Sequence, residues 1–382
     1  MKTFFKKFKP AHYINYIAIG ILTIVLSVIT MTGGRIDSST LFLLEKMSIS
    51  IILAVSLSLV VGFLGELSLG HAGFMCVGAY LSGKVASLLV PSLGNGILTF
   101  LIALLVGAAV AAICGIIIGI PALRLRGDYL AIVTLAFGEI VKSIFQNTSG
   151  DSFGGALGLS TPRFDKKYLF IISFVLVLVT LAVVQNFIRS KHGRAVTAIR
   201  DNEIAARATG INVTKYKLLT FIISATFAGI AGVLYSYSNY TVQSAKFGYN
   251  YSIEILVMVV LGGMGNINGS IIAAALITYL NTKLATVLTG DLAVLQNLLY
   301  ALILIVIVIY NNAPALKSFR DRFNLGNLWR KLIRHKHDPA NIKDDTAKWD
   351  VVPTKIEMNE VLSIDMVPPE IKDNTGNGGD KS

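Results

Sequence analysis

The chain has 382 residues, of which 54% are hydrophobic and only 15% are charged, against about 25% charged residues in soluble domains. Apolar runs of about 20 residues, each long enough to span a bilayer, recur along the chain, so the composition excludes a soluble protein and predicts an all-α, polytopic membrane protein. The formal net charge of +12 does not indicate nucleic acid as a partner, because the positive residues are divided among the short segments between the apolar runs.

The first apolar run, residues 13–31, follows a basic N-terminus with Lys2, Lys6, Lys7 and Lys9. A secretory signal peptide has the same order of charged and apolar residues, but it ends at a cleavage site of small residues, and none follows here. We therefore expect an uncleaved first membrane helix.

About ten apolar runs are candidate membrane spans, so the lipid bilayer is the first expected partner of the chain. In chain order they are residues 13–31, 41–62, 70–90, 97–120, 129–147, 167–188, 216–238, 251–265, 269–288 and 295–312. In this interpretation residues 1–337 form one transmembrane domain.

The distribution of lysine and arginine predicts the orientation of these spans. If the N-terminus is cytoplasmic, the inside segments carry twenty Lys and Arg residues and the outside segments carry five. Positive residues accumulate in cytoplasmic segments, so we expect both termini in the cytoplasm (N-in/C-in) and an even number of spans. The basic inside segments are the N-terminus, 121–128, 189–217 and 313–337.

A polar, glycine-rich stretch, GELSLGHAGFMCVGAY (residues 65–80), lies between the second and third predicted spans. It places Glu66, Ser68, Gly70, His71 and Gly73 near the inner membrane boundary, where a charge costs less than at the bilayer centre. Ser68 or a neighbour is expected to cap the third span, and the glycines allow close approach of another helix. The stretch is either a structural hinge and packing site or part of a translocation path or gate.

The basic inside segment at residues 189–217 is long for a connection between two spans. Its middle, residues 198–209, is rich in Ala, Glu and Arg and predicts a short cytoplasmic helix. Gly210 is the expected C-cap, and Asp201 and Glu203 lie near the first turn, where the helix dipole favours acids. A rigid helix between two spans is either a mechanical contact for a partner protein or a simple amphipathic surface helix.

Four glycines occur between residues 262 and 269, where the eighth predicted span ends and the ninth begins. Gly262, Gly263 and Gly265 favour either a tight inter-helix turn with close packing or a broken helix whose freed backbone groups line a path. The residues alone leave both interpretations open.

The sequence contains no convincing catalytic, nucleotide or metal motif. Residues 78–85 resemble a phosphate-binding loop, but Val85 stands where the loop needs Ser or Thr, and an apolar helix surrounds the match. The close pair His335 and His337 is not expected to bind a metal, and Cys76 and Cys114 are expected to be buried free thiols. We expect no enzyme activity and no cofactor bound by this chain, so any ATP is used by a separate subunit.

Residues 338–382 differ in composition from the rest of the chain. They contain ten Asp and Glu residues, five Lys and four of the nine prolines. This composition predicts a disordered, acidic cytoplasmic tail.

Three blocks of the sequence resemble a known family. IAARATG (residues 204–210) is similar to the Glu-Ala-Ala-x-x-x-Gly coupling motif of ABC importer permeases, although Ile204 stands at the glutamate position and Glu203 comes one residue earlier. The longer string AIRDNEIAARATGINVTKYKLLTFIISATFAGIAGVLY, the stretch at 65–80 and LVMVVLGGMGNINGSIIAAALI (residues 256–277) closely resemble branched-chain amino-acid ABC permeases of the LivM type.

The resemblance implies the ABC importer permease fold in the inner membrane of a bacterial cell. It also implies a sister permease subunit, two ABC ATPase subunits that use ATP, an extracytoplasmic substrate-binding protein, and leucine, isoleucine and valine as cargo. The ATPase-coupling residues implied by the motif and its surroundings are Asp201, Asn202, Glu203, Ala205, Ala206 and Gly210.

Two alternatives remain open at this point. A related importer for urea or short amides shares much of the same pattern. An ion-coupled secondary transporter would use intramembrane carboxylates as ion sites, and the candidates for that role are Glu66, Glu139 and Glu254.

Overall fold

The computed structural model describes residues 37–287 except positions 126 and 163, together with isolated residues between 16 and 27 and between 301 and 309. Almost all of the described chain is helical, which confirms the prediction of a polytopic, mostly helical membrane protein. The predicted spans at 13–31 and 295–312 lie almost wholly outside the described residues, as do the domain boundary at 337 and the acidic tail at 338–382.

The described chain consists of long helices joined by short connections. The elements are α3 (Ser38–Ser58), the π-helical turn η2 (Leu59–Leu64), α4 (His71–Leu93), α5 (Ile97–Ala122), α6 (Asp128–Asn147), α7 (Gly150–Phe153), η3 (Gly155–Leu157), β1 (Leu159–Ser160), α8 (Lys166–Arg189), α9 (Lys191–Asp201), α10 (Glu203–Ala208), α11 (Val213–Asn239), β2 (Thr241–Val242), η4 (Ser244–Phe247), α12 (Tyr249–Gly262) and α13 (Ile267–Val287).

The eight predicted spans within the described range each correspond to one long helix. Six of these helices are long and apolar enough to cross a membrane: α3 with η2, α4, α5, α8, α11 and α13. Helix α12 has only 14 residues, or about 21 Å at 1.5 Å per residue, which is shorter than the hydrocarbon core of about 30 Å. Helix α6 carries Asp128, Glu139 and Lys142 and is less apolar.

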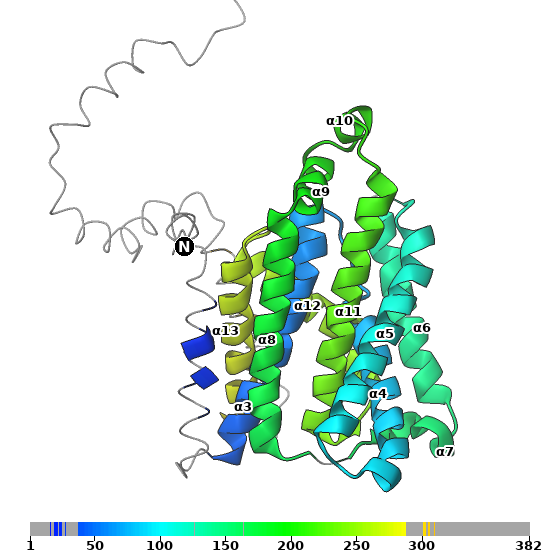
Figure 1. Cartoon of the computed structure of the whole chain (residues 1–382), viewed down its shortest axis with the longest axis vertical. Helices are drawn as coiled ribbons and strands as arrows, with labels where there is room; N and C mark the ends of the chain where they lie inside the picture. The colour runs from blue at the N-terminus through cyan, green and yellow to red at the C-terminus, as the bar shows by residue number, and fades with distance from the viewer. Residues whose placement is uncertain are drawn as a thin grey trace, which may run out of the picture. The chain divides into compact units, whose positions relative to one another are not determined.

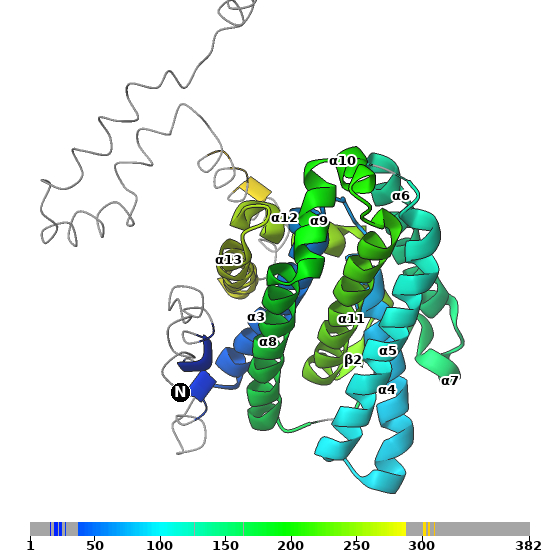
Figure 2. The ribbon, with the colours of Figure 1, turned by 45° about the horizontal axis from the view of Figure 1, so that its top comes forward.

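Two groups of helices pack around α3 and α11 (Figures 1 and 2). Helix α11 packs against α4 and α5, which also pack against each other, and α3 packs against α8, α11, α12 and α13. In its most apolar window α3 with η2 is 89% buried, whereas α5 is only 22% buried. Helix α3 is therefore central, and α5 presents an apolar face outward.

Glycines set the close approach of α4 to α11. A Cβ atom at Gly78 would lie 2.4 Å from the backbone oxygen of Gly229, and a Cβ at Gly229 would lie 2.3 Å from the Cβ of Ala111 on α5. Hydrophobic burial does not drive helix association in lipid, so close backbone packing of small residues replaces it.

The two ends of the helix bundle differ. One end carries α9 and α10, drawn at the top of Figure 1; we call it the α9–α10 end. The other end carries the antiparallel pair β1–β2, in which Leu159 is opposite Val242 and Ser160 is opposite Thr241. The hydroxyl of Tyr80 donates to the Val242 carbonyl at 2.9 Å, which ties this β1–β2 end to α4.

We predict that Gly78→Val lowers stability by about 1–3 kcal/mol or more, as overpacking of a tight core does. Thermal unfolding of the purified chain in detergent micelles measures the effect. Gly96→Val is the matched control, because Gly96 has no neighbouring atom within 4 Å of its Cβ position. Equal unfolding temperatures for the two variants would contradict the proposed role of the α4–α11 contact.

Candidate functional site

Helix α3 ends in a backbone break. After the π-helical turn η2, Gly65 adopts φ +79°, and its N–H and that of Glu66 both donate to the Val60 carbonyl. The chain then runs without helix to residue 70. The predicted interruption between the second and third spans is present, and the left-handed conformation explains the glycine at its start.

The start of α4 packs tightly on α6. A Cβ at Gly70 would lie 2.5 Å from the Thr134 carbonyl oxygen, and a Cβ at Gly73 would lie 2.7 Å from the Cα of Gly138. The N-cap of α4 is Gly70 and no side chain caps it. The expected cap by Ser68 is therefore wrong: Ser68 is 2% exposed, and α6 occupies the space beside the helix start.

His71 faces the protein interior. Its side chain is 2% exposed, and Nε2 lies 2.8 Å from the Ser56 hydroxyl on α3. The adjacent N–H of Ala72 donates to the Ser252 hydroxyl on α12 at 3.2 Å. His71 and the neighbouring Ala72 thus connect the start of α4 to α3 and α12, and the role of His71 in a path or gate stays a prediction.

The glycines at residues 262–265 form a tight turn between α12 and α13. Gly263 and Gly265 have φ +89° and +81°, and a Cβ at Gly262 would lie 2.4 Å from the Gly269 carbonyl carbon. The turn also touches the end of α3, because a Cβ at Gly62 would lie 2.4 Å from the Gly265 nitrogen. These residues pack closely at the α9–α10 end, and a gating role stays a prediction.

The segment at residues 189–217 contains two helices, α9 and α10, where the sequence predicts one over 198–209. The prediction of a continuous helix is wrong, because Asn202 is extended (φ −159°) and its side-chain oxygen accepts the N–H of Ala205 at 3.0 Å. Ser190 caps α9 in the same way. An Asn side chain competes for backbone groups in this manner, so it ends one helix and starts the next.

Gly210 terminates α10. Its N–H donates to the Arg207 carbonyl, and the Ile211 N–H donates to the Ala206 carbonyl, both at 3.1 Å. With φ +83° at Gly210, this is a Schellman motif. The expected helix end at Gly210 is present, and its geometry requires a left-handed residue.

A buried lysine connects α10 to the break after α3. Lys217 is 3% exposed, and its ammonium donates to carboxylate oxygens of Glu66 and, at 3.2 Å, of Glu203. Glu203 also accepts from Arg207 at 2.8 Å. Glu66 and Glu203 are 151 and 14 residues from Lys217 in the chain, so this contact joins distant segments.

Arg200 adds a second connection. Its Nη1 donates to the Gly62 carbonyl in the π-helical turn at 3.1 Å, and its Nε and Nη2 donate to Asp201 at 3.0 Å. Its side chain covers Gly65, where a Cβ would lie 2.7 Å from the Arg200 Cγ. We call Glu66, Arg200, Glu203 and Lys217 the charge cluster.

The charge cluster determines which residues α10 exposes. With Glu203 turned inward and Ala206 4% exposed, Ile204 is 76% exposed, and Ala205 and Gly210 are also exposed. In both views α10 stands at the extreme of its end of the bundle (Figure 2). The tip therefore presents a large apolar side chain beside small residues and the exposed Arg207.

Sequence reasoning found part of this arrangement. It assigned Glu66 and Gly265 to one group and Glu203 to another. The structure brings them together through Lys217 and Arg200, which sequence reasoning had counted only as positive charges.

Sequence reasoning also missed Glu45 on α3, which is 1% exposed and accepts from the Ser238 hydroxyl at 2.6 Å. A carboxylate within an apolar run was the available signal.

Among the described residues no three His, Cys, Asp or Glu side chains are grouped as metal ligands. His335 and His337 lie outside this part of the chain. The expectation that the chain itself binds no cofactor stays a prediction.

Comparison with known proteins places these features in context. The profile of a family described as "Branched-chain amino acid transport system / permease component" matches residues 39–309. The high-affinity branched-chain amino acid transport system permease protein LivM of Escherichia coli (strain K12) is 36% identical over 278 residues, which cover 65% of this chain and 63% of that protein.

Two further relatives show the breadth of similarity. A probable branched-chain amino acid transport permease protein LivM of Methanocaldococcus jannaschii is 30% identical over 203 residues, covering 50% of this chain and 57% of that protein. The ribose import permease protein RbsC of Escherichia coli (strain K12) is 27% identical over 316 residues, covering 77% of this chain and 92% of that protein. No solved structure matches the chain.

We predict that Lys217→Met destabilises the protein by roughly 3–5 kcal/mol, because it leaves the largely buried Glu66 carboxylate without its cation. Arg207→Gln is the matched control: it removes another cation from the same Glu203, but Arg207 is 63% exposed, and exposed pairs contribute only about 0–1 kcal/mol. Thermal unfolding in detergent micelles compares the variants. A Lys217→Met variant as stable as Arg207→Gln would show that the cluster does not hold this end together.

Proposed function

Because the chain belongs to the branched-chain amino acid transport system permease component family, we propose that it is the membrane-spanning permease subunit of an ATP-driven importer of leucine, isoleucine and valine. The identity to LivM proteins supports this cargo. The matched region spans 63% of the Escherichia coli protein, and the activity, cargo and partners of this chain belong to the proposal.

The observation that carries the proposal is the exposed tip of α10 and its connection to the membrane helices. Ile204, Ala205 and Gly210 are exposed at the extreme of the bundle, where a partner ATPase has access to them. The connection through Lys217 to Glu66 and through Arg200 to Gly62 joins that tip to the end of α3. A push on α10 by the ATPases would thus reach the break between α3 and α4.

The proposed topology places the α9–α10 end in the cytoplasm. Arg189, Lys191, Arg194, Arg200 and Arg207 all belong to this end, in agreement with the accumulation of positive residues on the cytoplasmic side. We extend this to ten spans with both termini inside, in a bacterial inner membrane. The β1–β2 end then faces the extracytoplasmic binding protein, and the outward apolar face of α5 is left for lipid or the sister permease.

The carboxylates that an ion-coupled transporter would need are engaged with protein partners. Glu66 pairs with Lys217, Glu139 pairs with Lys142 at 2.8 Å, and Glu254 accepts from Asn281 at 3.0 Å. These contacts favour the ATP-driven mechanism, in which this chain performs no chemistry and binds no nucleotide.

Uptake measurements test the cargo. We predict that cells relying on this chain and its partner subunits take up labelled leucine, isoleucine and valine, and that unlabelled ribose and urea do not compete. Uptake of ribose or urea without leucine would overturn the cargo proposal and leave family membership intact.

A second test concerns coupling. We predict that Gly210→Ala reduces transport per ATP hydrolysed, because a non-glycine residue in the left-handed conformation costs about 1–2 kcal/mol and weakens the end of α10. ATPase activity and uptake of the reconstituted complex are measured together. Gly94→Ala is the control: Gly94 has φ +72° with ψ 175° and open space around it, so alanine is at least as strained there, but Gly94 lies at the β1–β2 end. Equal coupling ratios in both variants would rule out the docking role of α10.

A further inference from the structure

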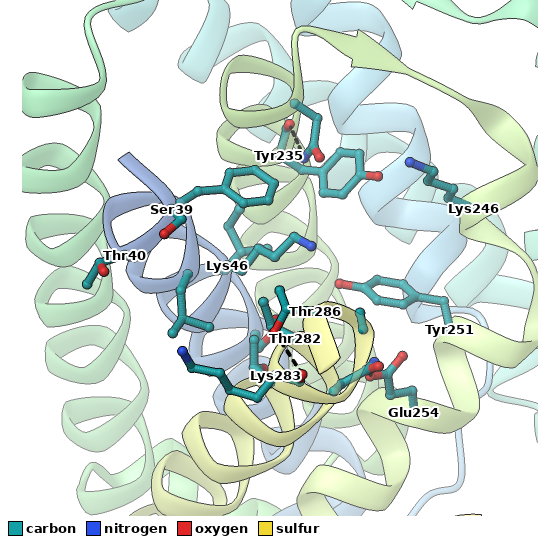
Figure 3. A pocket seen from close by; sticks show the side chains of 18 of the residues that line it. Ser39, Thr40, Lys46, Tyr235, Lys246, Tyr251, Glu254, Thr282, Lys283 and Thr286 are labelled. Carbon is teal, nitrogen blue, oxygen red and sulfur yellow. Dashed lines mark hydrogen bonds between the residues drawn. The ribbon is translucent and has the colours of Figure 1, made fainter. Parts of the chain in front are cut away.

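A large cavity opens at the β1–β2 end, far along α3 from the charge cluster. It has a volume of about 1040 Å³ and lies among α3, α11, η4, α12 and α13 (Figure 3). Ligand pockets have volumes of about 300–1,000 Å³, so the cavity has room for a small solute and its water. Its lining combines lysines, a glutamate, tyrosines and apolar side chains.

Two lysines from different elements face this cavity without a salt bridge to a described carboxylate. Lys46 is on α3 and Lys246 on η4, and neither forms an ion pair with a described carboxylate. The ammonium of Lys46 lies 4.6 Å from the centre of the Phe42 ring. The ammoniums of Lys46 and Lys246 approach the same space in Figure 3. Two like charges that face one space repel each other, and an anion bound between them would relieve this repulsion.

The position of Lys46 argues against a surface role. It lies eight residues into α3, or about 12 Å along the helix axis. A charged residue at such a place in a membrane helix points to a substrate or ion site.

A negative group lies in the same cavity. Glu254 on α12 interacts electrostatically with Lys46, and its Oε1 accepts from Asn281 Nδ2 on α13 at 3.0 Å. In Figure 3 the hydroxyls of Tyr235 and Tyr251 point toward the space that the Lys46 and Lys246 ammoniums approach, whereas Lys283 points away from it. The cavity therefore holds both signs of charge, separated across its interior.

We propose that this cavity is an extracytoplasmic receiving site for the zwitterion of an α-amino acid. The carboxylate is bound between Lys46 and Lys246, and the ammonium is bound toward Glu254. The apolar side chains of Phe42, Leu43 and Ile49 in the same lining contact the amino-acid side chain. This inference rests on the proposed function and deepens it by locating the cargo on this chain.

The charge pattern separates amino acids from the other solutes that related permeases carry. A neutral sugar or urea can accept hydrogen bonds from the two lysines but has no negative charge to offset their repulsion. An anionic lipid headgroup would satisfy the lysines, but Glu254 would repel it. A solute with both charges matches both groups, and charge-assisted hydrogen bonds to it are stronger than neutral ones.

The test is direct binding of tritiated leucine to the full chain in phosphatidylcholine nanodiscs. We expect Lys46→Gln, Lys246→Gln and Glu254→Gln each to weaken binding by about 10- to 100-fold, as the loss of a hydrogen bond between charged groups does. Lys283→Gln is the matched control, because it removes the same charge from the cavity rim and leaves the proposed contacts in place. Lys46→Arg, which keeps the charge, is expected to restore most of the binding if the variant chains fold.

Competition by analogues of leucine tests which charged groups of the ligand the cavity binds. Leucinol lacks the carboxylate and 4-methylpentanoate lacks the ammonium, and we expect both to compete at least 10-fold less well than unlabelled leucine. Three results would each overturn the site. Leucinol could compete as well as leucine, or Lys283→Gln could weaken leucine binding as much as Lys46→Gln does. Leucine binding could also be lost only when anionic phosphatidylglycerol is added.

Uptake by cells separates this proposal from the proposed function. If the wild-type complex imports leucine and the Lys46→Gln and Lys246→Gln variants import it equally well, the site is wrong and the importer function stands. If the wild-type complex imports no branched-chain amino acid, the function itself fails.

Discussion

The α9–α10 end depends on one ammonium group that is almost completely removed from water. A buried charge is very costly unless it is paired, so Lys217 requires its two carboxylates, and both come from other parts of the chain. Glu66 can reach it only because the chain leaves the helix after Gly65. Glu203 can reach it only because α10 starts afresh at Asn202. These contacts use one face of α10, and the opposite face, which includes Ile204, is left exposed.

Helix α3 runs from the cavity with Lys46 at one end to the charge cluster at the other. Its first half brings Lys46 to the cavity at the β1–β2 end, and the π-helical turn that follows it brings Gly62 to Arg200. It is also the most buried of the six apolar helices, so it moves only if its neighbours rearrange. In the proposed importer, cargo at one end and nucleotide-driven motion at the other would act on the same helix.

Much of the fold was predictable because the bilayer determines it. Apolar runs of fixed length predicted eight helices within the described range, six of them long and apolar enough to cross a membrane, and glycines marked the break at 65 and the turn at 262–265. The helix at 198–209 was predicted as continuous because its residues favour helix, and only the extended backbone of Asn202 divides it. The partners of Lys217 and Arg200 could not be predicted, because local sequence carries no information on which distant carboxylate or carbonyl a cation meets. Lys46 and Glu45 were visible as adjacent charges in an apolar run and received no role.

The π-helical turn at Leu59–Leu64 has a consequence for the kind of motion that α3 permits. A π-turn contains one residue more than an α-turn, so conversion between the two is all-or-none. Taking up that residue turns the following chain by about 100° and shifts it by about 1.5 Å along the axis. Since Arg200 donates to the Gly62 carbonyl of this turn, such a conversion would have to break that hydrogen bond, and it would reorient Glu66 by one whole residue step.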